Sequence, residues 1–459
     1  MAMAAQLEFN LTSLGNNLQD LAQAKRWLVA FSGGLDSTVL LHGLAQLRQT
    51  ETWLPQLLAI HINHGLSEEA DNWQRHCQQF CATWDIPFIS ETISVTASGE
   101  GLEAAAREAR YRAIEKHLQA EDVLLTAHHR DDQAETLLLR LLRGAGVRGL
   151  AAMARERKLG DVPIKRPLLP FSRAQLADYA KLHKLAYCED ESNQQPHFDR
   201  NFLRNDVLPL LQQRWPNLSQ RWAQTADNLA DSDRALAELA GIDLAFCKAE
   251  TARMGWRLQL NDFFRLSVER RNNLLRYWCE QSGLPPPERL HLMMLASAIE
   301  NSENDPDSAV AIQWPGVTLR SFRACLYLLP SQKLEATIDI SANQELTLNQ
   351  QTISLPDGGR ITVTLGHNGL RTDLGPLSLR WREGGEHCHP EWRRHSQSLK
   401  KCLQEYGLEP WLRERLPLIF AGERLVAVAD LWVNAGFRAP EIESGLIFRW
   451  RYPHSESSQ

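Results

Sequence analysis

Ser32-Gly33-Gly34-Leu35-Asp36-Ser37 follows directly after the apolar run 27–31 in this chain of 459 residues. The apolar run predicts a buried strand, and residues 38–48 after the turn carry leucine and valine at helical spacing. A glycine-rich turn between a strand and a helix directs backbone N–H groups and the helix dipole at an anion. We therefore expect a phosphate site here, with the hydroxyl groups of Ser32 and Ser37 as further donors.

The carboxylate at position 36 needs a cation beside it. It would repel bound phosphates unless Mg²⁺ lies between them, and Mg²⁺ commonly binds one or two carboxylates together with phosphate oxygens. The turn also lacks the lysine of a Walker A motif. It resembles instead the SGGxDS "PP-loop" of the ATP pyrophosphatases, which cleave ATP between its α- and β-phosphates. An ordinary strand-to-helix turn, with serine as a helix cap, is the alternative.

The composition is that of a globular protein with several domains. Hydrophobic residues make up 43% of the chain, charged residues 23%, and the formal net charge is −6. This charge argues against a protein that coats nucleic acid indiscriminately. Because no apolar run reaches membrane-spanning length and residues 1–8 do not look like a signal peptide, we expect a cytoplasmic protein. The eight cysteines include no C-x-x-C pair, so neither a disulfide framework nor a zinc or iron–sulfur site is indicated.

Short apolar runs alternate with longer periodic segments between residues 27 and 143. The pattern predicts strands at 27–31, 57–62, 88–93 and 123–127, and helices at 38–48, 68–84, 102–118 and 132–143. Such an alternation is typical of right-handed βαβ units and a parallel sheet. Ligands of these sheets bind beyond the carboxyl ends of the strands. The glycine turn, His61–His64 and His128–Asp132 all fall at that rim.

Two of these rim stretches offer polar groups with alternative roles. His61 ends the second strand, where it either lines the nucleotide pocket or is a hydrogen-bonded loop residue. Asp131 and Asp132 open the last predicted helix. One of them can cap that helix, which leaves the other carboxylate for Mg²⁺.

Several arginines are candidates for contact with phosphate. Arg107 either pairs with Glu103 on a solvated helix face or contacts phosphate, whereas Arg110 has no acidic residue four positions before it. Arg200 and Arg204 would share one helix face and either bind phosphate or pair with acidic neighbours. Between residues 140 and 173, nine Lys or Arg residues stand against two acidic ones. This segment is either a solvated loop or an RNA-backbone contact.

With these pieces in order, the first half of the chain resembles the tRNA(Ile)-lysidine synthetase family. The stretches that carry the resemblance are SGGLDS at 32–37, HINHGL at 61–66, EAAAREARY at 103–111, AHHRDDQAET at 127–136, and ESN at 191–193 followed by DRNFLRNDVLP at 199–209. Only the first is shared widely among PP-loop enzymes, and the set is specific. In that family, ATP adenylates the C2 oxygen of the wobble cytidine in the CAU anticodon of an isoleucine tRNA. Free lysine then displaces AMP and gives lysidine.

The resemblance implies a role for each rim residue. Ser32 to Ser37 and His61 would bind ATP, and Asp36 and Asp132 would hold Mg²⁺ across the phosphates. His128 would lie near the reacting α-phosphate. Free lysine arrives as an ammonium with a pKa near ~10.4, so a base must take its proton, and His128 or an adjacent carboxylate is our hypothesis for that base. Contacts to tRNA or phosphate are expected from six basic residues: Arg107, Arg110, Arg200, Arg204, Lys400 and Lys401.

The organisation changes beyond about residue 217. Residues 219–301 read as helical throughout, and residues 353–365 alternate as in a strand. Residues 380–386, 399–401, 410–413 and 417–419 resemble the family's C-terminal domain, which acts on the tRNA. Trp381, Arg382 and Arg413 join the two lysines as candidate RNA contacts, although core tryptophans are the commoner case for Trp381 and Trp411.

The expected fold is therefore α/β: a parallel, doubly wound PP-loop domain at 1–217, a helical tRNA- or substrate-binding domain at 218–335, and a small α+β tRNA-recognition domain at 336–459. Whether the protein forms a homodimer is left open. Rival classes are a cytosine thiolase, an amidating PP-loop synthetase and a non-catalytic RNA-binding adaptor. The lack of C-x-x-C argues against the first, and the lack of an N-terminal nucleophilic cysteine against the second. Intact Ser32, Asp36 and Asp132 argue against the third.

Overall fold

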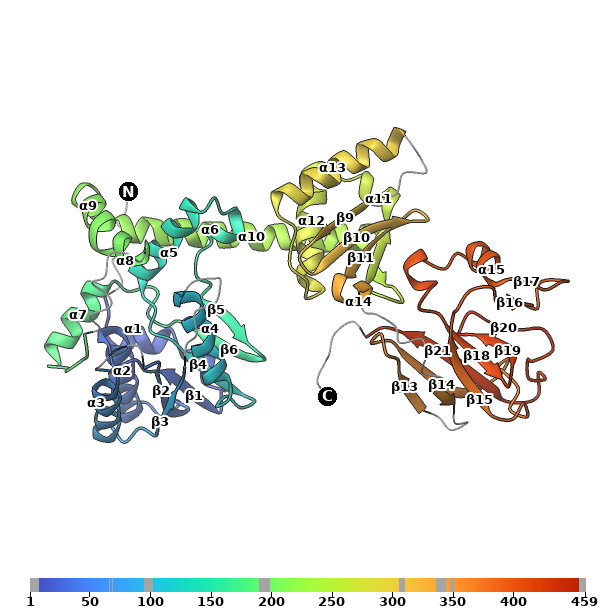
Figure 1. The fold of residues 1–459 in the computed structure, drawn as a ribbon. Coiled ribbons are helices and arrows are strands. Elements are labelled where there is room, and N and C mark those ends of the chain that lie inside the picture. The colour runs from blue at the N-terminus through green and yellow to red at the C-terminus, as the bar shows by residue number, and fades with distance from the viewer. Residues whose placement is uncertain are drawn as a thin grey trace. The chain divides into compact units, whose positions relative to one another are not determined.

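The computed structural model describes residues 8–65, 67, 69–94, 102–189, 199–304, 310–335, 344–346 and 351–453. The stretch ESN at 191–193 lies outside these residues. The chain divides into two compact units, residues 1–235 and 236–459, which we call unit 1 and unit 2 (Figure 1). The domain boundaries expected at 217/218 and 335/336 stay predictions.

Unit 1 is built on a six-stranded sheet of order β3-β2-β1-β4-β6-β5. The strands are β1 (Arg26–Ala30), β2 (Gln56–Asn63), β3 (Phe88–Thr92), β4 (Asp122–Leu125), β5 (Glu156–Leu159) and β6 (Val162–Lys165). All neighbours pair in parallel except β5, which is antiparallel to β6. Because β1 lies between β2 and β4, the residues that follow these three strands meet at one edge.

Helices cover both faces of this sheet (Figure 1). The side chains of β1 alternate between two cores: Trp27 and Val29 enter one, and Leu28 enters the other. The first core also contains residues of α2 and α3, and the second contains residues of α4. The helical segments of this part of the chain are α1 (Leu11–Asn16), η1 (Gln19–Leu21), α2 (Leu35–Thr50), α3 (Ala70–Thr83), α4 (Leu102–Glu115), α5 (Arg130–Leu142), α6 (Val147–Leu150), α7 (Arg173–Leu182), α8 (Asp199–Phe202), the π-helical turn η3 (Leu203–Val207), α9 (Leu208–Arg214) and α10 (Leu218–Phe246).

These elements confirm the predicted parallel, doubly wound domain, and each strand and helix expected between residues 27 and 143 is present within a few residues. The basic segment 140–173 is more ordered than a loop, because it contains α6 and the β5–β6 hairpin. Several of its cations serve the fold: Arg140 donates to the carbonyls of Gly149 and Ala152 (both 2.7 Å), and Lys165 pairs with Asp20 (2.8 Å).

Unit 2 begins with a helical region that also carries an antiparallel sheet of order β7-β8-β11-β10-β9. Its strands are β7 (Glu250–Thr251), β8 (Trp256–Gln259), β9 (Ala311–Trp314), β10 (Val317–Phe322) and β11 (Cys325–Pro330), and its helices are α11 (Leu260–Phe264), α12 (Val268–Gln281), α13 (Arg289–Asn304) and α14 (Ser331–Glu335). The prediction that 219–301 is helical throughout is therefore wrong at 250–259. There, β8 pairs with β11 and buries Leu258 completely.

The C-terminal part of unit 2 is rich in antiparallel strands, as expected. One sheet has the order β12-β15-β18-β19-β20, a second β13-β14-β21 and a third β16-β17. Their bounds are β12 (Gln344–Leu346), β13 (Gln351–Ser354), β14 (Arg360–Gly366), β15 (Leu377–Trp381), β16 (His387–Cys388), β17 (Gln397–Ser398), β18 (Pro417–Ala421), β19 (Arg424–Val428), β20 (Trp432–Val433) and β21 (Gly445–Arg451), with helical segments α15 (Leu399–Tyr406) and η4 (Pro410–Leu412).

Candidate active site

The glycine turn lies between β1 and α2, as predicted. Gly33 has φ +83°, and a β-carbon there would lie 2.8 Å from the Sγ atom of Cys77, so only glycine fits. Gly34 is the N-cap residue of α2 and has no side chain to cap the helix. The first N–H groups of α2 are therefore available to a ligand. Ser32 Oγ and Ser37 Oγ lie 3.1 Å apart. The turn therefore has the geometry of an anion site at a helix N-terminus.

Asp36, His129 and Asp132 come together beside this turn. The Nε2 atom of His129 lies 3.5 Å from Asp36 Oδ2 and 3.5 Å from Asp132 Oδ2. His129 is also the N-cap of α5, where its Nδ1 accepts a hydrogen bond from the backbone N–H of Asp132 (3.3 Å) and Asp132 accepts one from the N–H of His129 (3.0 Å). Residues 36 and 132, which are far apart in the chain, thus meet at one imidazole, and the predicted convergence at the rim is confirmed.

The protonation of His129 follows from these contacts. Burial lowers its pKa, but the Asp132 and Asp36 carboxylates outweigh burial and raise the pKa to about 9. The Nε2–H of the ring faces the two carboxylates, and this contact favours protonation of His129. For Asp132, burial raises the pKa, but His129 and Arg200 lower it well below its ordinary value. Asp132 is therefore ionised at neutral pH.

The cap assignment of Asp131 or Asp132 needs correction. The helix begins at Arg130, two residues earlier than predicted, and His129 caps it with Asp132 as the reciprocal partner. Asp131 has a structural role instead: its Oδ1 accepts a hydrogen bond from Ser219 Oγ (2.7 Å) and its Oδ2 one from the backbone N–H of Arg173 (2.8 Å). Asp131 thus joins the starts of α7 and α10 to α5.

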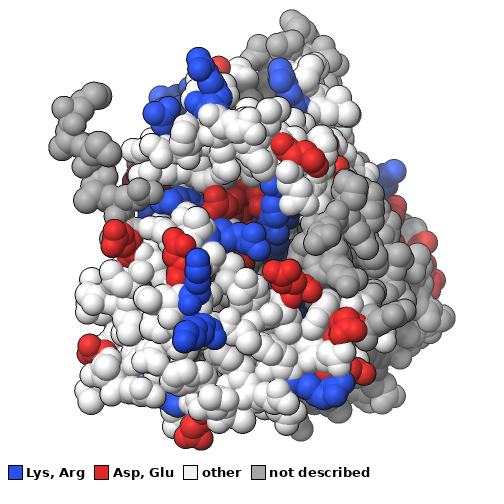
Figure 2. All heavy atoms as spheres, turned by 90° about the vertical axis from the view of Figure 1, so that its left-hand side faces the viewer, with Lys and Arg blue, Asp and Glu red and all other residues white. Residues whose placement is uncertain are grey.

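Arg200 and Arg204 pair with acidic neighbours, which was one of the two alternatives for them. Both guanidinium groups contact Asp132 Oδ1, at 3.1 Å and 3.0 Å, and both contact the carboxylate of Glu135, at 2.9 Å and 2.6 Å. The side chain of Glu135 is only 2% exposed. Two arginines and two carboxylates therefore form a network without net charge. Figure 2, which looks onto unit 1, shows a hollow in which basic and acidic side chains gather.

His128 lies next to this network and is uncharged at neutral pH. Burial is the main cause that lowers its pKa to about 4; Asp132 opposes the shift, while the charges of Arg166, Arg200 and Arg107 add to it. Its Nδ1 lies 3.0 Å from Thr126 Oγ1. The imidazole is therefore neutral at neutral pH, and its lowered pKa makes it a weaker base than a free imidazole.

His61 is buried and hydrogen-bonded. Its Nδ1 lies 3.0 Å from the carbonyl oxygen of Phe31, the residue just before the glycine turn, and 3.5 Å from Cys77 Sγ. Burial lowers the pKa of His61, against the effect of the hydrogen bond to Phe31. The contact with Phe31 joins His61 to the start of the glycine turn. A direct contact of His61 with ATP stays a prediction.

The two arginines of α4 point to different partners. Arg110 Nη2 lies 3.0 Å from His64 Nε2, and the guanidinium of Arg107 lies 5.6 Å from the centre of the Tyr111 ring. Of Glu103, the proposed pairing partner of Arg107, the side chain lies outside the described residues. Phosphate contacts of both arginines stay predictions.

In unit 2, Lys400 and Lys401 are exposed in the first turn of α15, as RNA contacts would need to be. Trp381 is 3% exposed and belongs to the hydrophobic core, and Trp411 packs on Tyr327 with ring centres 5.0 Å apart. The core interpretation of both tryptophans is therefore confirmed. Arg382 and Arg413 engage protein groups: Arg382 pairs with Glu386 (3.5 Å) and Arg413 donates to the carbonyl of Leu408 (2.9 Å).

Sequence reasoning missed two residues of the site, His129 and Glu135. Both stand in the stretch 127–136 that was singled out, but neither had an assigned role. The signal for His129 was its place three residues before Asp132, the spacing of a reciprocal cap. The signal for Glu135 was the pair of arginines at 200 and 204, which needed a buried counter-charge.

Three family models match this chain: a PP-loop domain over residues 3–211, a TilS substrate binding domain over 258–327 and a TilS substrate C-terminal domain over 377–450. The tRNA(Ile)-lysidine synthase of Pseudomonas aeruginosa is 41% identical over 450 residues, which cover 96% of this chain and 97% of that protein. The tRNA(Ile)-lysidine synthase of Serratia proteamaculans is 40% identical over 436 residues, 94% of this chain and 97% of that protein. Because the similarity spans nearly the full length of both chains, this protein belongs to the tRNA(Ile)-lysidine synthase family.

Proposed function

We propose that this protein joins free lysine to C2 of the wobble cytidine in the CAU anticodon of an isoleucine tRNA, with conversion of ATP to AMP and pyrophosphate. The modification changes the identity of the tRNA from methionine to isoleucine. The observation that carries the proposal is the meeting of Asp36, in the SGGLDS turn, with His129 and Asp132 at one rim of the sheet, in a chain of this family. Association into a homodimer stays a prediction.

Asp36 and Asp132 fit a magnesium site completed by phosphate. The Oδ1 atom of Asp36 is buried and accepts no hydrogen bond within the described chain. Within the same residues no cluster of three or more His, Cys, Asp or Glu could hold a metal alone. Two carboxylates are what Mg²⁺ commonly takes from a protein when ATP oxygens and water supply the rest of its shell. Bound there, the ion would neutralise charge on the phosphates during their cleavage.

Adenylation then depends on position and charge. The C2 oxygen of cytidine forms a bond to the α-phosphorus, and the bond from that phosphorus to the bridging oxygen breaks, which releases pyrophosphate. The N–H groups at the start of α2 face the departing pyrophosphate. Arg200 and Arg204 neutralise Asp132 and Glu135, so the site does not repel ATP and RNA as two bare buried carboxylates would.

Lysine transfer needs a base for the lysine ammonium. His128, which lies beside the rim that holds Asp132, or an adjacent carboxylate is our candidate. After the ammonium loses its proton, the amine attacks C2, the C2–O bond breaks and AMP leaves with the oxygen. The rim residues thus position the reactants in both half-reactions.

The first experiment measures incorporation of radiolabelled lysine into unmodified isoleucine tRNA bearing a CAU anticodon, with ATP and Mg²⁺ and with a control lacking ATP. ATP-dependent incorporation is expected. Release of AMP and pyrophosphate with bulk tRNA but without incorporation of lysine would move the proposal to another nucleoside modification. Absence of ATP–pyrophosphate exchange with any tRNA would favour the adaptor alternative.

A His128→Ala variant tests the base. We expect adenylate formation to persist while lysine transfer falls by about 10²-fold or more, the usual contribution of general base catalysis. Adenylate is measured as AMP attached to tRNA in the absence of lysine. Equal loss of both half-reactions would assign His128 to ATP binding instead.

A further inference from the structure

Two cysteine side chains lie beside the glycine turn. A β-carbon at Gly33 would lie 2.8 Å from Cys77 Sγ and 3.6 Å from Cys188 Sγ, so both sulfur atoms approach the same point. Cys77 belongs to α3, whereas Cys188 stands in the segment that follows α7. The fold therefore brings two free thiols, far apart in the chain, to the turn that has the geometry of a phosphate site.

Cys188 differs from the other cysteines in its accessibility. All eight cysteines lie in the described part of the chain; seven of them are buried, and Cys188 is half-buried. Buried cysteines commonly serve as small apolar residues, and Cys77 does belong to the core that contains residues of α2 and α3. Packing thus accounts for Cys77, while the thiol of Cys188 is open to a small oxidant.

Both cysteines are connected to the backbone around the turn. The backbone N–H of Cys188 donates a hydrogen bond to the carbonyl oxygen of Gly33 (2.8 Å). On the other side, Cys77 Sγ lies 3.5 Å from Nδ1 of His61, and the same nitrogen lies 3.0 Å from the carbonyl oxygen of Phe31. Phe31 precedes the turn and Gly33 lies within it. A displacement of either cysteine therefore reaches the backbone that presents N–H groups to phosphate.

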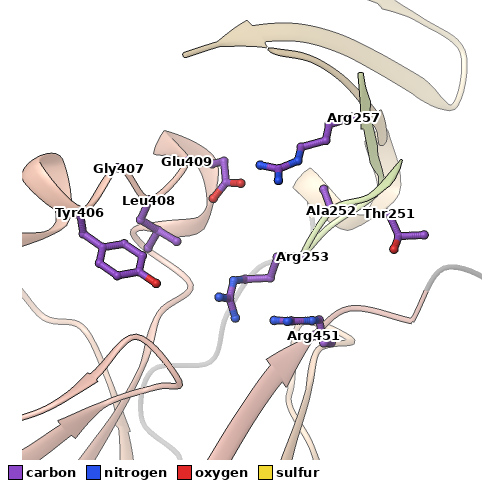
Figure 3. Close-up of a pocket in the computed structure, with 9 residues that line it drawn as sticks. All are labelled: Thr251, Ala252, Arg253, Arg257, Tyr406, Gly407, Leu408, Glu409 and Arg451. Carbon is purple, nitrogen blue, oxygen red and sulfur yellow. The ribbon is translucent and has the colours of Figure 1, made fainter. Parts of the chain in front are cut away.

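A buried thiol of unit 2 offers a comparison. Cys325 is 8% exposed, and burial raises the pKa of its thiol. The charges of Arg257 and Glu409 also act on that pKa, and both residues line a cavity of about 340 Å³ (Figure 3). The nine lining residues drawn in Figure 3 include no cysteine. The cavity therefore offers Cys325 no second thiol for a disulfide, which makes Cys325 a matched control for Cys188.

We propose that Cys77 and Cys188 form a site of reversible oxidation, at which a disulfide between them weakens the binding of ATP. The proposal rests on the function proposed above, because it concerns the regulation of that same site. Cys188 Sγ attacks an oxygen of hydrogen peroxide, the O–O bond breaks, and a sulfenic acid and one water form. Cys77 Sγ then attacks the sulfenic sulfur, the S–O bond breaks, and a second water leaves. Two thiols thus lose two electrons and two protons to the peroxide.

The thiol pair should stay reduced until the concentration of peroxide rises. Burial raises the pKa of both Cys77 and Cys188, so little of the reactive thiolate is present at neutral pH.

The disulfide would act on ATP through the position of Gly33. A bond between the two sulfurs draws α3 and the segment after α7 together across the space beside Gly33, which only a glycine leaves free. The hydrogen bond from Cys188 carries this movement into the turn. Because a displacement of about 1 Å at a reacting group can cost about 10²-fold in rate, a small shift of the phosphate donors is sufficient.

The test compares the unaltered protein with Cys188→Ser before peroxide, after peroxide and after dithiothreitol. Cys188→Ser keeps the backbone N–H that bonds Gly33, whereas truncation of Cys77 would leave a void in the core. Peptide mass spectrometry without reduction detects the link between residues 77 and 188. Isothermal titration calorimetry with ATP and Mg²⁺ gives Kd.

We expect peroxide to link Cys77 to Cys188 in the unaltered protein and to raise Kd for ATP by about tenfold, the usual cost of one hydrogen bond to a charged group. Dithiothreitol should restore the original Kd. Cys188→Ser should keep its affinity for ATP through both treatments. The control Cys325→Ala, which lacks a thiol of unit 2, should respond to peroxide as the unaltered protein does.

Four outcomes would overturn the proposal. They are the absence of the link after peroxide, a link that leaves Kd unchanged, a loss of affinity that dithiothreitol does not reverse, and an equal loss of affinity in peroxide-treated Cys188→Ser. The last outcome would show that peroxide acts elsewhere in the protein. A loss of the peroxide response in Cys325→Ala would likewise move the oxidation site to unit 2.

Lysine incorporation, measured in parallel, separates this proposal from the proposed function. If the reduced protein incorporates no lysine but binds ATP, and the link reversibly weakens that binding, the proposed function fails and the oxidation site stands. If incorporation depends on ATP and continues unchanged in protein that peroxide has treated, the oxidation site fails and the proposed function stands.

Discussion

The arginines of unit 1 and unit 2 differ in what surrounds them. Arg200 and Arg204 share the carboxylates of Asp132 and Glu135 in a network that is mostly buried. Arg360 and Arg449 are exposed on strands without a single acidic residue. Paired, buried charge fixes the positions of side chains and is little affected by salt, whereas unpaired, exposed charge attracts a polyanion and is screened by salt. The comparison separates charge that fixes the positions of side chains from charge that stays open to solvent and salt.

The largest effect is expected from Asp36→Asn, which removes charge from the rim of unit 1 and leaves unit 2 unaltered. Adenylation should fall by about 10³-fold, because the variant lacks a ligand for phosphate-bound Mg²⁺, while Kd for tRNA changes less than twofold. ATP-dependent AMP release and anisotropy measure the two quantities. The control Asp131→Asn alters a structural carboxylate and should keep the rate. Retained adenylation in Asp36→Asn would remove Asp36 from the site.

Next comes Glu135→Ala, which breaks the buried network. Because Glu135 is 2% exposed and two cations lose a partner, the free energy of unfolding of unit 1 should drop by about 3 kcal/mol. Urea unfolding measures it. Glu108→Ala is the matched control, since Glu108 and its partner Arg112 are 69% and 68% exposed, and it should cost less than about 1 kcal/mol. Similar costs for both would mean that the network is not effectively buried.

A smaller effect is expected on the pH dependence of the stability of unit 1. Burial and the nearby His183 lower the pKa of His42 to about 4, and its Nδ1 lies 2.9 Å from the hydroxyl of Tyr179. Between pH 6.5 and 4 the unfolded chain binds more protons at this histidine than the folded one, so stability falls as pH falls. Between pH 7 and 5 the loss should be about 1–2 kcal/mol, and His42→Gln should reduce the pH dependence by that amount in urea unfolding. The same slope in both proteins would contradict this.

The smallest effect concerns Lys400 and Lys401 of unit 2. A cation in the first turn of a helix opposes the helix dipole, so Lys400→Gln/Lys401→Gln should stabilise the protein by about 0.5 kcal/mol. If these lysines contact phosphate, the slope of log Kd for tRNA against log salt should also fall by about 1–2. Lys181 lies in the last turn of α7, where a cation interacts favourably with the helix dipole. Lys181→Gln should therefore destabilise the protein slightly. An unchanged salt slope would exclude the lysines from the RNA contact.

Much of unit 1 could be predicted because the strands β1, β2 and β4 bury both faces and a helix such as α3 buries one. The runs at 27–31 and 57–62 are almost uninterrupted apolar stretches, and glycines at 33 and 34 mark the turn between a strand and a helix. The β5–β6 hairpin escaped this reasoning because Glu156, Arg157 and Lys158 are consecutive charged residues and look like a loop. β8 escaped because four residues are too few for a clear alternation.

The site was predictable in location but not in its pairings. The motifs identified Asp36, His128 and Asp132, whereas the partnership of Arg204 with Glu135 spans 69 residues of sequence and exists only in the folded chain. The position of His129 between two carboxylates likewise depends on β1 and β4 lying side by side. The opposition of Arg360 and Arg451 was not predicted, because the register of β14 and β21 cannot be read from either strand alone.

The opposition of Arg360 and Arg451 also bears on protein engineering. A screen that selects variants for heat resistance alone should enrich for loss of Arg360, since that loss removes the repulsion and leaves the ion pair of Arg451 with Asp430 intact. Heat resistance reports only on the fold, so such a screen would not reveal whether the selected variants still convert their substrate. Laboratory evolution of this protein should therefore select for turnover at limiting tRNA and for thermal tolerance in the same round.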